Sequence, residues 1–247
     1  MVTILTSSLG GYYQVDGKRV PTYLSNANGL TDKIKSYWKE NAKVLIVSAG
    51  PEEVERNDMI LHCQREAFAM SGLKAESFTM CDSRNEQVIE KINEYDVVML
   101  AGGHVPTQNK FFEKLSLKKR LTGYQGIVIA WSAGSMNSAE VVYAQPELTG
   151  EGTDPEYQRF LTGLGITKRM IIPHFQTVRK STLDGLRIIE DITFSDSIGN
   201  EFIALNDGSF LISDHGMETL YGEAFLIKDG KLTQICKNNE SIELSEA

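Results

Sequence analysis

The chain has 247 residues, of which 41% are hydrophobic and 23% are charged, a composition typical of a globular protein with a large buried core. Its formal net charge of −8 argues against nucleic acid or an anionic membrane as a partner, because both need a basic surface. No stretch approaches the roughly 20 apolar residues of a membrane span, and the N-terminus lacks the basic region of a signal peptide. Cys63, Cys81 and Cys236 show no CxxC spacing, which is typical of free thiols, so we expect a cytoplasmic protein.

The first half of the sequence alternates short apolar runs with helical patterns. The apolar runs lie at 2–5, 43–50, 96–103 and 126–131, and the helical patterns lie at 29–40, 54–71, 84–93 and 107–120. Strands that are apolar along their whole length and separated by helices indicate a parallel sheet covered on both faces. The alternation therefore predicts a doubly wound α/β architecture.

The pattern changes after residue 140. Residues 143–165 are rich in Pro, Gly and acidic residues and predict a long loop. The further predicted elements are a strand ending within 170–175, a helix near 180–192, and a β-rich tail from residue 201 with hairpin signals at Asp207-Gly208 and Asp229-Gly230. No long linker divides the sequence, so we expect a single domain over 1–247.

One strand ends on a serine between small residues, in the segment Ala130-Trp131-Ser132-Ala133-Gly134. This segment approaches the G-x-S-x-G nucleophile elbow, in which small neighbours let the chain bend sharply while the serine Oγ stays exposed. The N–H of Ala133 would then open a helix and could stabilise an oxyanion. The alternative is a plain turn in which Ser132 caps the helix.

A second strand ends in the paired glycines of the segment 101–109, AGGHVPTQN. Paired glycines at the carboxyl end of a strand allow backbone N–H groups to face a ligand. A plain turn is the alternative, and the pattern matches neither a P-loop nor a GxGxxG fingerprint.

A serine nucleophile needs a base, and His174 is our candidate among the four histidines. It follows an apolar strand, so a parallel sheet would bring it to the same edge as Ser132. Asp207 follows another apolar run and could orient the imidazole, although Asp-Gly is also a hairpin signal. The resulting chain order Ser, His, Asp differs from the Ser, Asp, His order of α/β-hydrolases.

The segments VVMLAGGHVPTQNKFF, GIVIAWSAGSMNSA, IIPHF and FIALNDGSF together resemble peptidase family S51, the serine peptidases that include dipeptidase E and cyanophycinase. The resemblance runs from about residue 43 to residue 213. It implies an α/β fold like that of class I glutamine amidotransferases, with a mostly parallel sheet and helices on both faces. It also implies a peptidase without a metal or cofactor, and it suggests cleavage after an N-terminal aspartate.

The resemblance also assigns roles by position. It makes Ser132 the nucleophile, His174 the base, Asp207 the acidic residue that orients the histidine, and the N–H groups of Gly103 and Ala133 the oxyanion donors. Glu147 lies near a second acidic position proposed for the third member of the triad, and this alternative stays open.

Two residues are candidates for substrate binding. His104 would lie at the rim of the site, and Arg179, with Arg187 as an alternative, could grip an aspartyl carboxylate in a bidentate manner. We therefore expect a serine-type peptidase that hydrolyses short peptides, with Asp-Xaa dipeptides as candidate substrates and a homodimer as a candidate assembly. The alternatives are a repurposed amidotransferase-like module that binds a small molecule without catalysis, and an esterase of similar mechanism.

Overall fold

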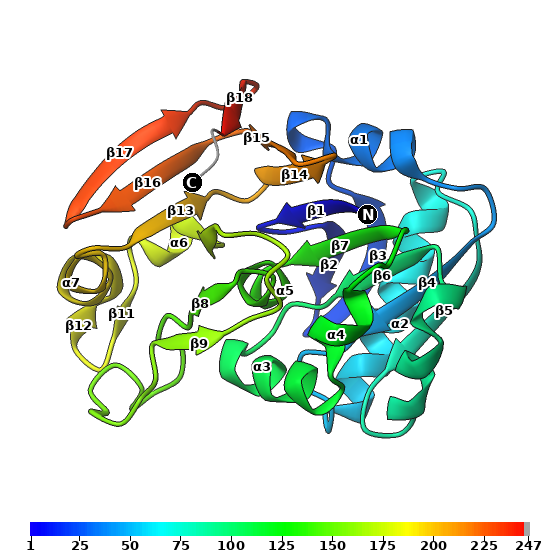
Figure 1. The fold of residues 1–247 in the computed structure, drawn as a ribbon, viewed down its shortest axis with the longest axis horizontal. Coiled ribbons are helices and arrows are strands. Elements are labelled where there is room, and N and C mark those ends of the chain that lie inside the picture. Colours follow the sequence, from blue (N-terminus) through cyan, green and yellow to red (C-terminus); the bar gives the residue numbers. More distant parts are fainter. Residues whose placement is uncertain (245–247) are drawn as a thin grey trace.

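The computed structural model describes residues 1–244 and contains a large eight-stranded sheet next to a smaller four-stranded sheet (Figure 1). The strands of the large sheet are β1 (Val2–Thr6), β4 (Ala42–Val47), β5 (Ala75–Cys81), β6 (Val97–Leu100), β7 (Ile127–Trp131), β14 (Phe210–Asp214), β15 (Met217–Tyr221) and β18 (Ser241–Leu244). Strand β1 pairs in parallel with β7, β7 with β6, β6 with β4, and β4 with β5, while β14, β15 and β18 extend the sheet in antiparallel fashion. The sheet is mostly parallel, as the apolar runs predict.

Helices cover both faces of the large sheet. They are η1 (Ala27–Gly29), α1 (Leu30–Tyr37), α2 (Val54–Met70), η2 (Glu86–Glu94), α3 (Val105–Lys114) and α4 (Leu117–Leu121). Side chains alternate between the faces along a strand, so Ile46 packs in one core with Phe68 of α2, while Leu45 packs in the other with Phe111 of α3. This double burial explains why the strands are apolar at nearly every position.

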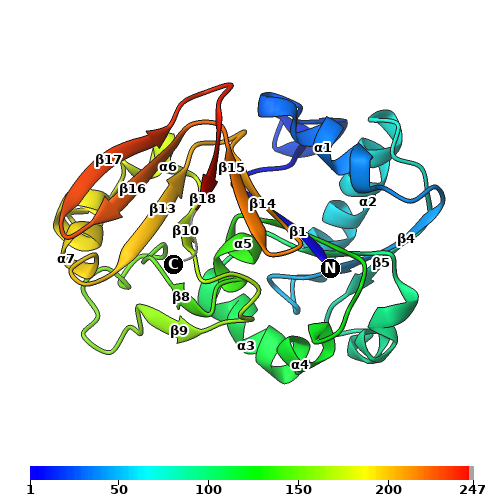
Figure 2. The ribbon, with the colours of Figure 1, turned by 45° about the horizontal axis from the view of Figure 1, so that its top comes forward.

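The small sheet consists of β10 (Met170–Ile172), β13 (Glu201–Leu205), β16 (Ala224–Lys228) and β17 (Lys231–Cys236). Strands β10 and β13 are parallel, whereas β16 and β17 follow in antiparallel fashion. The ring of Tyr143 stacks on that of Phe202 in the core of this sheet, with centroids 4.3 Å apart. The predicted β-rich tail is thus divided between the two sheets (Figure 2).

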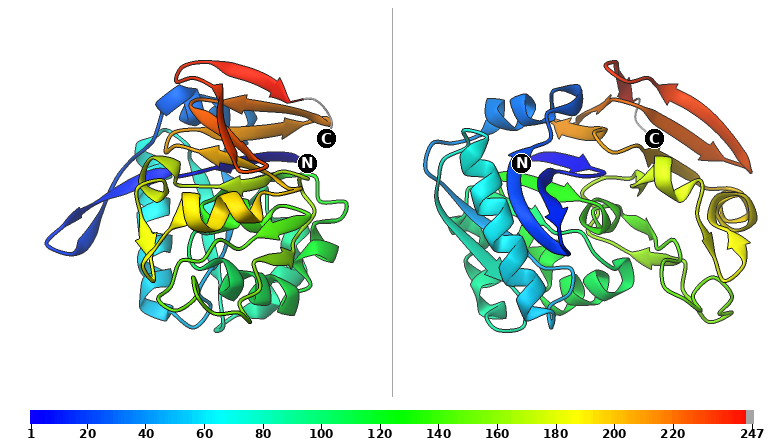
Figure 3. Two further views of the ribbon diagram at one scale, coloured as in Figure 1. Left: turned by 90° about the vertical axis from the view of Figure 1, so that its left-hand side faces the viewer. Right: turned by 180° about the vertical axis from the view of Figure 1, so that it is seen from behind.

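Three two-stranded ribbons complete the fold. They are β2 (Gly10–Val15) with β3 (Lys18–Leu24), β8 (Val141–Tyr143) with β9 (Phe160–Thr162), and β11 (Thr182–Leu183) with β12 (Leu186–Arg187). The β2–β3 hairpin projects beyond the body of the molecule in the left view of Figure 3. Its turn, Asp16-Gly17, has positive φ at both residues, as the most common hairpin turn requires.

Two predicted elements are wrong. The helix expected near 180–192 is replaced by the β11–β12 ribbon, because Asp184 and Gly185 both take positive φ and turn the chain; η3 (Ile188–Thr193) and α7 (Phe194–Asp196) follow. The hairpin expected at Asp207-Gly208 does not form either, since β13 and β14 belong to different sheets. The hairpin at Asp229-Gly230 is confirmed and joins β16 to β17.

Candidate active site

The site lies where parallel strands of both sheets end at their carboxyl edges. In the large sheet, Thr6 of β1 pairs with Trp131 of β7, so Ser7 and Ser132 leave two neighbouring strands at the same level. The next strand, β6, ends at Leu100 and leads into Gly102. Parallel pairing therefore gathers three chain exits at one edge, where open α/β sheets bind their ligands.

Ser132 stands on a strained turn between β7 and α5 (Ala133–Asn137). Its φ of 52° and ψ of −121° are rare for a residue with a side chain. A glycine is needed at position 134, because a Cβ there would lie 2.2 Å from the carbonyl oxygen of Leu100. The Ser132 hydroxyl makes no capping bond to the helix, so the plain helix cap considered from the sequence is not what this turn provides.

The small sheet supplies the imidazole and the carboxylate. Ile172 of β10 pairs with Ala204 of the parallel strand β13, and His174 and Asp207 follow these strands. His174 opens the short helix α6 (Phe175–Val178) with a positive φ of 129°. Its Nε2 lies 2.8 Å from the Oγ of Ser132, and its Nδ1 lies 2.8 Å from Oδ1 of Asp207.

The Asp207 carboxylate has further partners that we did not predict. The buried Ser7 hydroxyl donates to Oδ1 at 2.6 Å and lies 3.3 Å from Nδ1 of His174. Gln176 donates to Oδ2 at 2.7 Å and accepts the backbone N–H of Asp207 at 3.0 Å. Burial opposes ionisation, but the hydrogen bonds from His174, Ser7 and Gln176 outweigh it and lower the pKa of Asp207 to about 2.

Glu147, the alternative acidic residue, occupies a different position. It lies in the loop after β8 and makes no hydrogen bond to His174, although it lines the cavity that reaches Ser132 and His174. Partial burial raises the pKa of Glu147, and the neighbouring Glu151 carboxylate adds to this effect. The geometry therefore brings Asp207, and not Glu147, to the imidazole.

The glycine pair after β6 packs tightly against the serine turn. A Cβ at Gly102 would lie 2.9 Å from the ring of Trp131, and a Cβ at Gly103 would lie 2.7 Å from the Cβ of Ala49. Within the described part of the chain, no hydrogen bond uses the N–H of Gly103. The N–H of Ala133 is the first of helix α5 and so has no acceptor inside that helix. Neither amide therefore has a hydrogen-bond acceptor within residues 1–244.

A cavity of about 230 Å³ reaches Ser132 and His174. Its walls carry two cations, Arg19 and Arg56, and the carboxylate of Glu147. Arg19 comes from the β2–β3 hairpin and stacks on Tyr12, with 4.3 Å from its guanidinium carbon to the ring centroid. A larger hollow of about 740 Å³ lies between α3, α4 and β9 and contains none of these residues.

The residues expected to bind substrate lie elsewhere. His104 stands at the N-cap position of α3, and its Nε2 lies 2.8 Å from Oε1 of Glu151, which ties the loop after β8 to the segment that follows Gly103. Arg179 does not line the cavity, because its guanidinium lies over the rings of Phe175 and Phe225. Arg187 pairs with Asp191 through two hydrogen bonds. The cavity arginines, Arg19 and Arg56, carried no motif in the sequence.

This hydroxyl, imidazole and carboxylate in hydrogen-bonded series define the chemistry of serine hydrolases. The model of peptidase family S51 matches residues 24–220, so the chain belongs to this family and is a serine peptidase. Among solved structures, the fold is similar to that of "a Putative Peptidase E Protein from Listeria monocytogenes EGD-e", with a TM-score of 0.54 and 12% identity. That similarity covers 95% of this chain and 97% of the other. No curated protein matches the sequence.

Residues 1–244 contain neither a candidate metal site nor a candidate membrane span. Within residues 1–244, no cluster of three or more His, Cys, Asp or Glu side chains could hold a metal ion. None of the helices in the same range combines the length and the apolar character that crossing a membrane requires.

Proposed function

We propose that the protein hydrolyses short peptides by acyl transfer through Ser132. His174 Nε2 accepts the hydroxyl proton as Oγ attacks the carbonyl carbon, and it then gives this proton to the leaving amine. Water enters the acyl-enzyme by the same route and releases the acid. The observation that carries the proposal is the continuous series from Ser132 Oγ through His174 to Asp207, with both contacts at 2.8 Å.

Asp207 completes this triad in the proposal. Its Oδ1 accepts a hydrogen bond from the Nδ1–H of His174, so it holds the imidazole in the tautomer whose Nε2 can accept a proton from Ser132. With a pKa of about 2, Asp207 stays ionised at any ordinary pH and stabilises the imidazolium that forms during attack.

The carbonyl oxygen of the substrate becomes the oxyanion of the tetrahedral intermediate, and it accepts hydrogen bonds from the N–H groups of Gly103 and Ala133. Ala133 follows Ser132 in the chain, and Gly103 follows Gly102, which packs against Ser132. Neither N–H has a hydrogen-bond acceptor among the described residues. One such donor contributes about 10²–10³ in rate. The two donors therefore matter to the rate as much as the base does.

The cavity supports short peptides as substrates, with N-terminal aspartate as the preferred first residue. About 230 Å³ holds one or two residues, and Arg19 and Arg56 supply guanidinium groups that suit a carboxylate. His104 bonds to Glu151, which in turn accepts the backbone N–H of Glu147, a residue of the cavity wall. We place the enzyme in the cytoplasm, since its three cysteines are free, and we propose that residues 1–247 act as one domain in a homodimer.

The test is the release of free amino acid from a dipeptide library that includes Asp-Xaa members. Wild type should hydrolyse a subset, and Ser132→Ala should abolish turnover while circular dichroism and melting temperature stay unchanged. Ser36→Ala, at an exposed hydroxyl on α1, is the matched control. A fluorophosphonate should label wild type at Ser132. If wild type neither turns over a peptide nor reacts with the probe, the fold serves as a binding module.

A further inference from the structure

The peptide that joins Gly102 to Gly103 is held between two walls. On one side, Gly102 packs against Trp131 and Ser132; a Cβ on Gly102 would be 3.0 Å from the Cβ of Ser132. On the other side, Gly103 packs against Ala49 and against the guanidinium of Arg56, whose nitrogens lie 3.5 and 3.6 Å from the Cβ position of Gly103. This peptide therefore has little room to rotate.

Arg56 contacts the same peptide through a polar atom. Its Nη2 donates to the carbonyl oxygen of Gly102 at 3.4 Å, a long contact, and its Nη1 donates to Glu53 Oε2 at 2.5 Å. The C=O and N–H of a trans peptide point in opposite directions. A group that holds the Gly102 carbonyl on one side consequently directs the N–H of Gly103 to the other.

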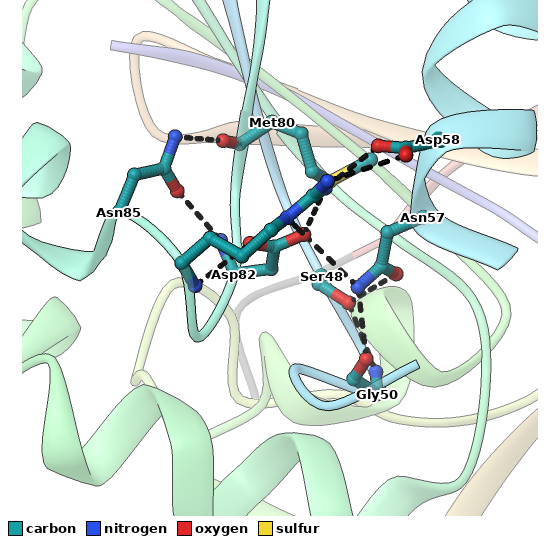
Figure 4. A network of polar contacts seen from close by, with 8 residues as sticks. Ser48, Gly50, Asn57, Asp58, Met80, Asp82 and Asn85 are labelled. Atoms are coloured by element: carbon teal, nitrogen blue, oxygen red, sulfur yellow. Dashed lines mark hydrogen bonds and ion pairs between the residues drawn. The ribbon is translucent and has the colours of Figure 1, made fainter. Parts of the chain in front are cut away.

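A buried network fixes the helix turn that carries Arg56. Asn57, only 1% exposed, accepts from Ser48 at 2.7 Å and donates to the carbonyl of Gly50 at 3.0 Å and to Asp82 at 3.3 Å (Figure 4). Asp82 is fully buried and paired with Arg84. Burial opposes its ionisation, but the hydrogen bonds from Arg84 and Asn57 lower the pKa of Asp82.

The network anchors both groups that touch Gly103. Ala49 lies between Ser48 and Gly50, the two residues bonded to Asn57, and Arg56 precedes Asn57 in α2. Polar groups buried this deeply hold one arrangement, because each would be left unsatisfied in another. The ends of β4 and β5 and the start of α2 thus form a rigid support for the glycine pair.

We propose that Arg56 is a positioning residue that holds the Gly102–Gly103 peptide with the N–H of Gly103 directed at the oxyanion of the reaction. The inference rests on the function proposed above and adds a residue that acts through the backbone. A simpler role, in which Arg56 only binds a substrate carboxylate, makes a different prediction. That role would change KM for acidic substrates and leave neutral substrates unaffected.

The experiment uses full-length wild type, Arg56→Gln and Arg56→Lys, with Arg65→Gln as the control on the same helix. Arg65 is exposed and pairs with Glu66. The substrate is p-nitrophenyl acetate, which has no carboxylate, and the oxyanion probe is a small alkylboronic acid that forms a tetrahedral adduct with serine. We expect Arg56→Gln to lower kcat on the ester by roughly tenfold with little change in KM, a fraction of the full value of one oxyanion donor. The boronic acid should bind more weakly by a similar factor.

Arg56→Lys should recover part of the loss, since it keeps a cationic donor, and Arg65→Gln should match wild type. Unchanged ester kinetics and boronic acid affinity in Arg56→Gln would overturn the inference, as would a change confined to KM for acidic peptides. Failure of the proposed function would look different, because wild type itself would then react with neither the ester nor a fluorophosphonate.

Discussion

Ser132 and His174 follow strands of different sheets and both have positive φ, yet the hydroxyl of Ser132 lies 2.8 Å from Nε2 of His174. Such backbone conformations cost about 1–3 kcal/mol each and persist only where the surroundings enforce them. Contacts around each of the two residues hold its backbone in this conformation. Gly134 fits under Leu100 at the serine turn, and the parallel strands β10 and β13 bring His174 to Asp207. The strain thus accompanies the contact on which the proposed chemistry depends.

Replacing Asp207 tests the identity of the third member of the triad. Asp207→Asn keeps the shape but favours the wrong imidazole tautomer, so kcat should fall by about 10⁴-fold. Glu147→Gln is the matched variant, and it should alter KM more than kcat because Glu147 lines the cavity without touching the imidazole. Steady-state kinetics on the best dipeptide will decide. The reverse ranking of the two kcat values would transfer the role to Glu147.

Ser7 is expected to support the carboxylate. A hydrogen bond to a charged group contributes about 1.5–3 kcal/mol, and part of this is retained through Gln176, so Ser7→Ala should lower kcat/KM by roughly tenfold. The melting temperature should also fall by a few degrees, because the lost hydrogen bond stabilises the folded state, so the kinetics are measured well below the unfolding transition. The same kinetic assay measures the effect, with Ser36→Ala as control. Wild-type kcat/KM in Ser7→Ala would mean that His174 and Gln176 suffice to hold Asp207.

Acid should weaken the fold partly through Asp207. Its pKa of about 2 lies below the value of about 3.9 for an unfolded chain, so the folded state binds fewer protons in this interval. The stabilisation is fully present above the unfolded pKa and is lost as pH falls through the folded pKa. The free energy of urea unfolding should therefore fall less in Asp207→Asn than in wild type between about pH 5 and about pH 2. Parallel curves for the two proteins would contradict this assignment.

Gly134→Ala should destabilise the whole protein. The new Cβ would lie 2.2 Å from a backbone oxygen of β6, so the backbone itself must shift, at a cost of about 1–3 kcal/mol. Thermal unfolding measures this loss. Gly152→Ala is the control, because its Cβ would meet the Asp184 side chain, which can move, and it should cost less. Equal melting temperatures for the two variants would show that the serine turn relaxes easily.

The parts of the site that follow apolar strands could be predicted from the sequence. Ser132, His174 and Asp207 each come after a strand, and the carboxyl ends of parallel strands meet at one edge. Both glycines after β6 follow the same rule. The mostly parallel sheet with helices on both faces was predictable for a related reason, since strands buried on two faces lose their polar alternation.

Other residues could not be predicted, because their roles depend on which strands are neighbours. Ser7 matters because β1 lies next to β7, although 120 or so residues separate them in the chain, and nothing in an apolar pattern gives strand order. Arg19 and Arg56 reach the cavity from a hairpin and a helix. The β2–β3 hairpin carries an Asp-Gly signal at Asp16-Gly17, the same signal that is found at 207–208 and 229–230. At 207–208 the hairpin that this signal predicts does not form, since the chain passes from the small sheet to the large sheet there.

Residues 206–209 connect β13 of the small sheet to β14 of the large sheet, so the geometry of the site depends on how the two sheets pack together. Ser132 follows a strand of the large sheet and His174 follows a strand of the small one, while Asp207 lies on the connection between the two sheets. A displacement of about 1 Å between the two sheets would take Oγ of Ser132 beyond hydrogen-bonding distance of Nε2 of His174. The hydrogen bonds within each sheet would still be intact. The rate of proton transfer is therefore more sensitive to the packing between the two sheets than any measure of secondary structure. Mutations far from the cavity can abolish activity by weakening that packing.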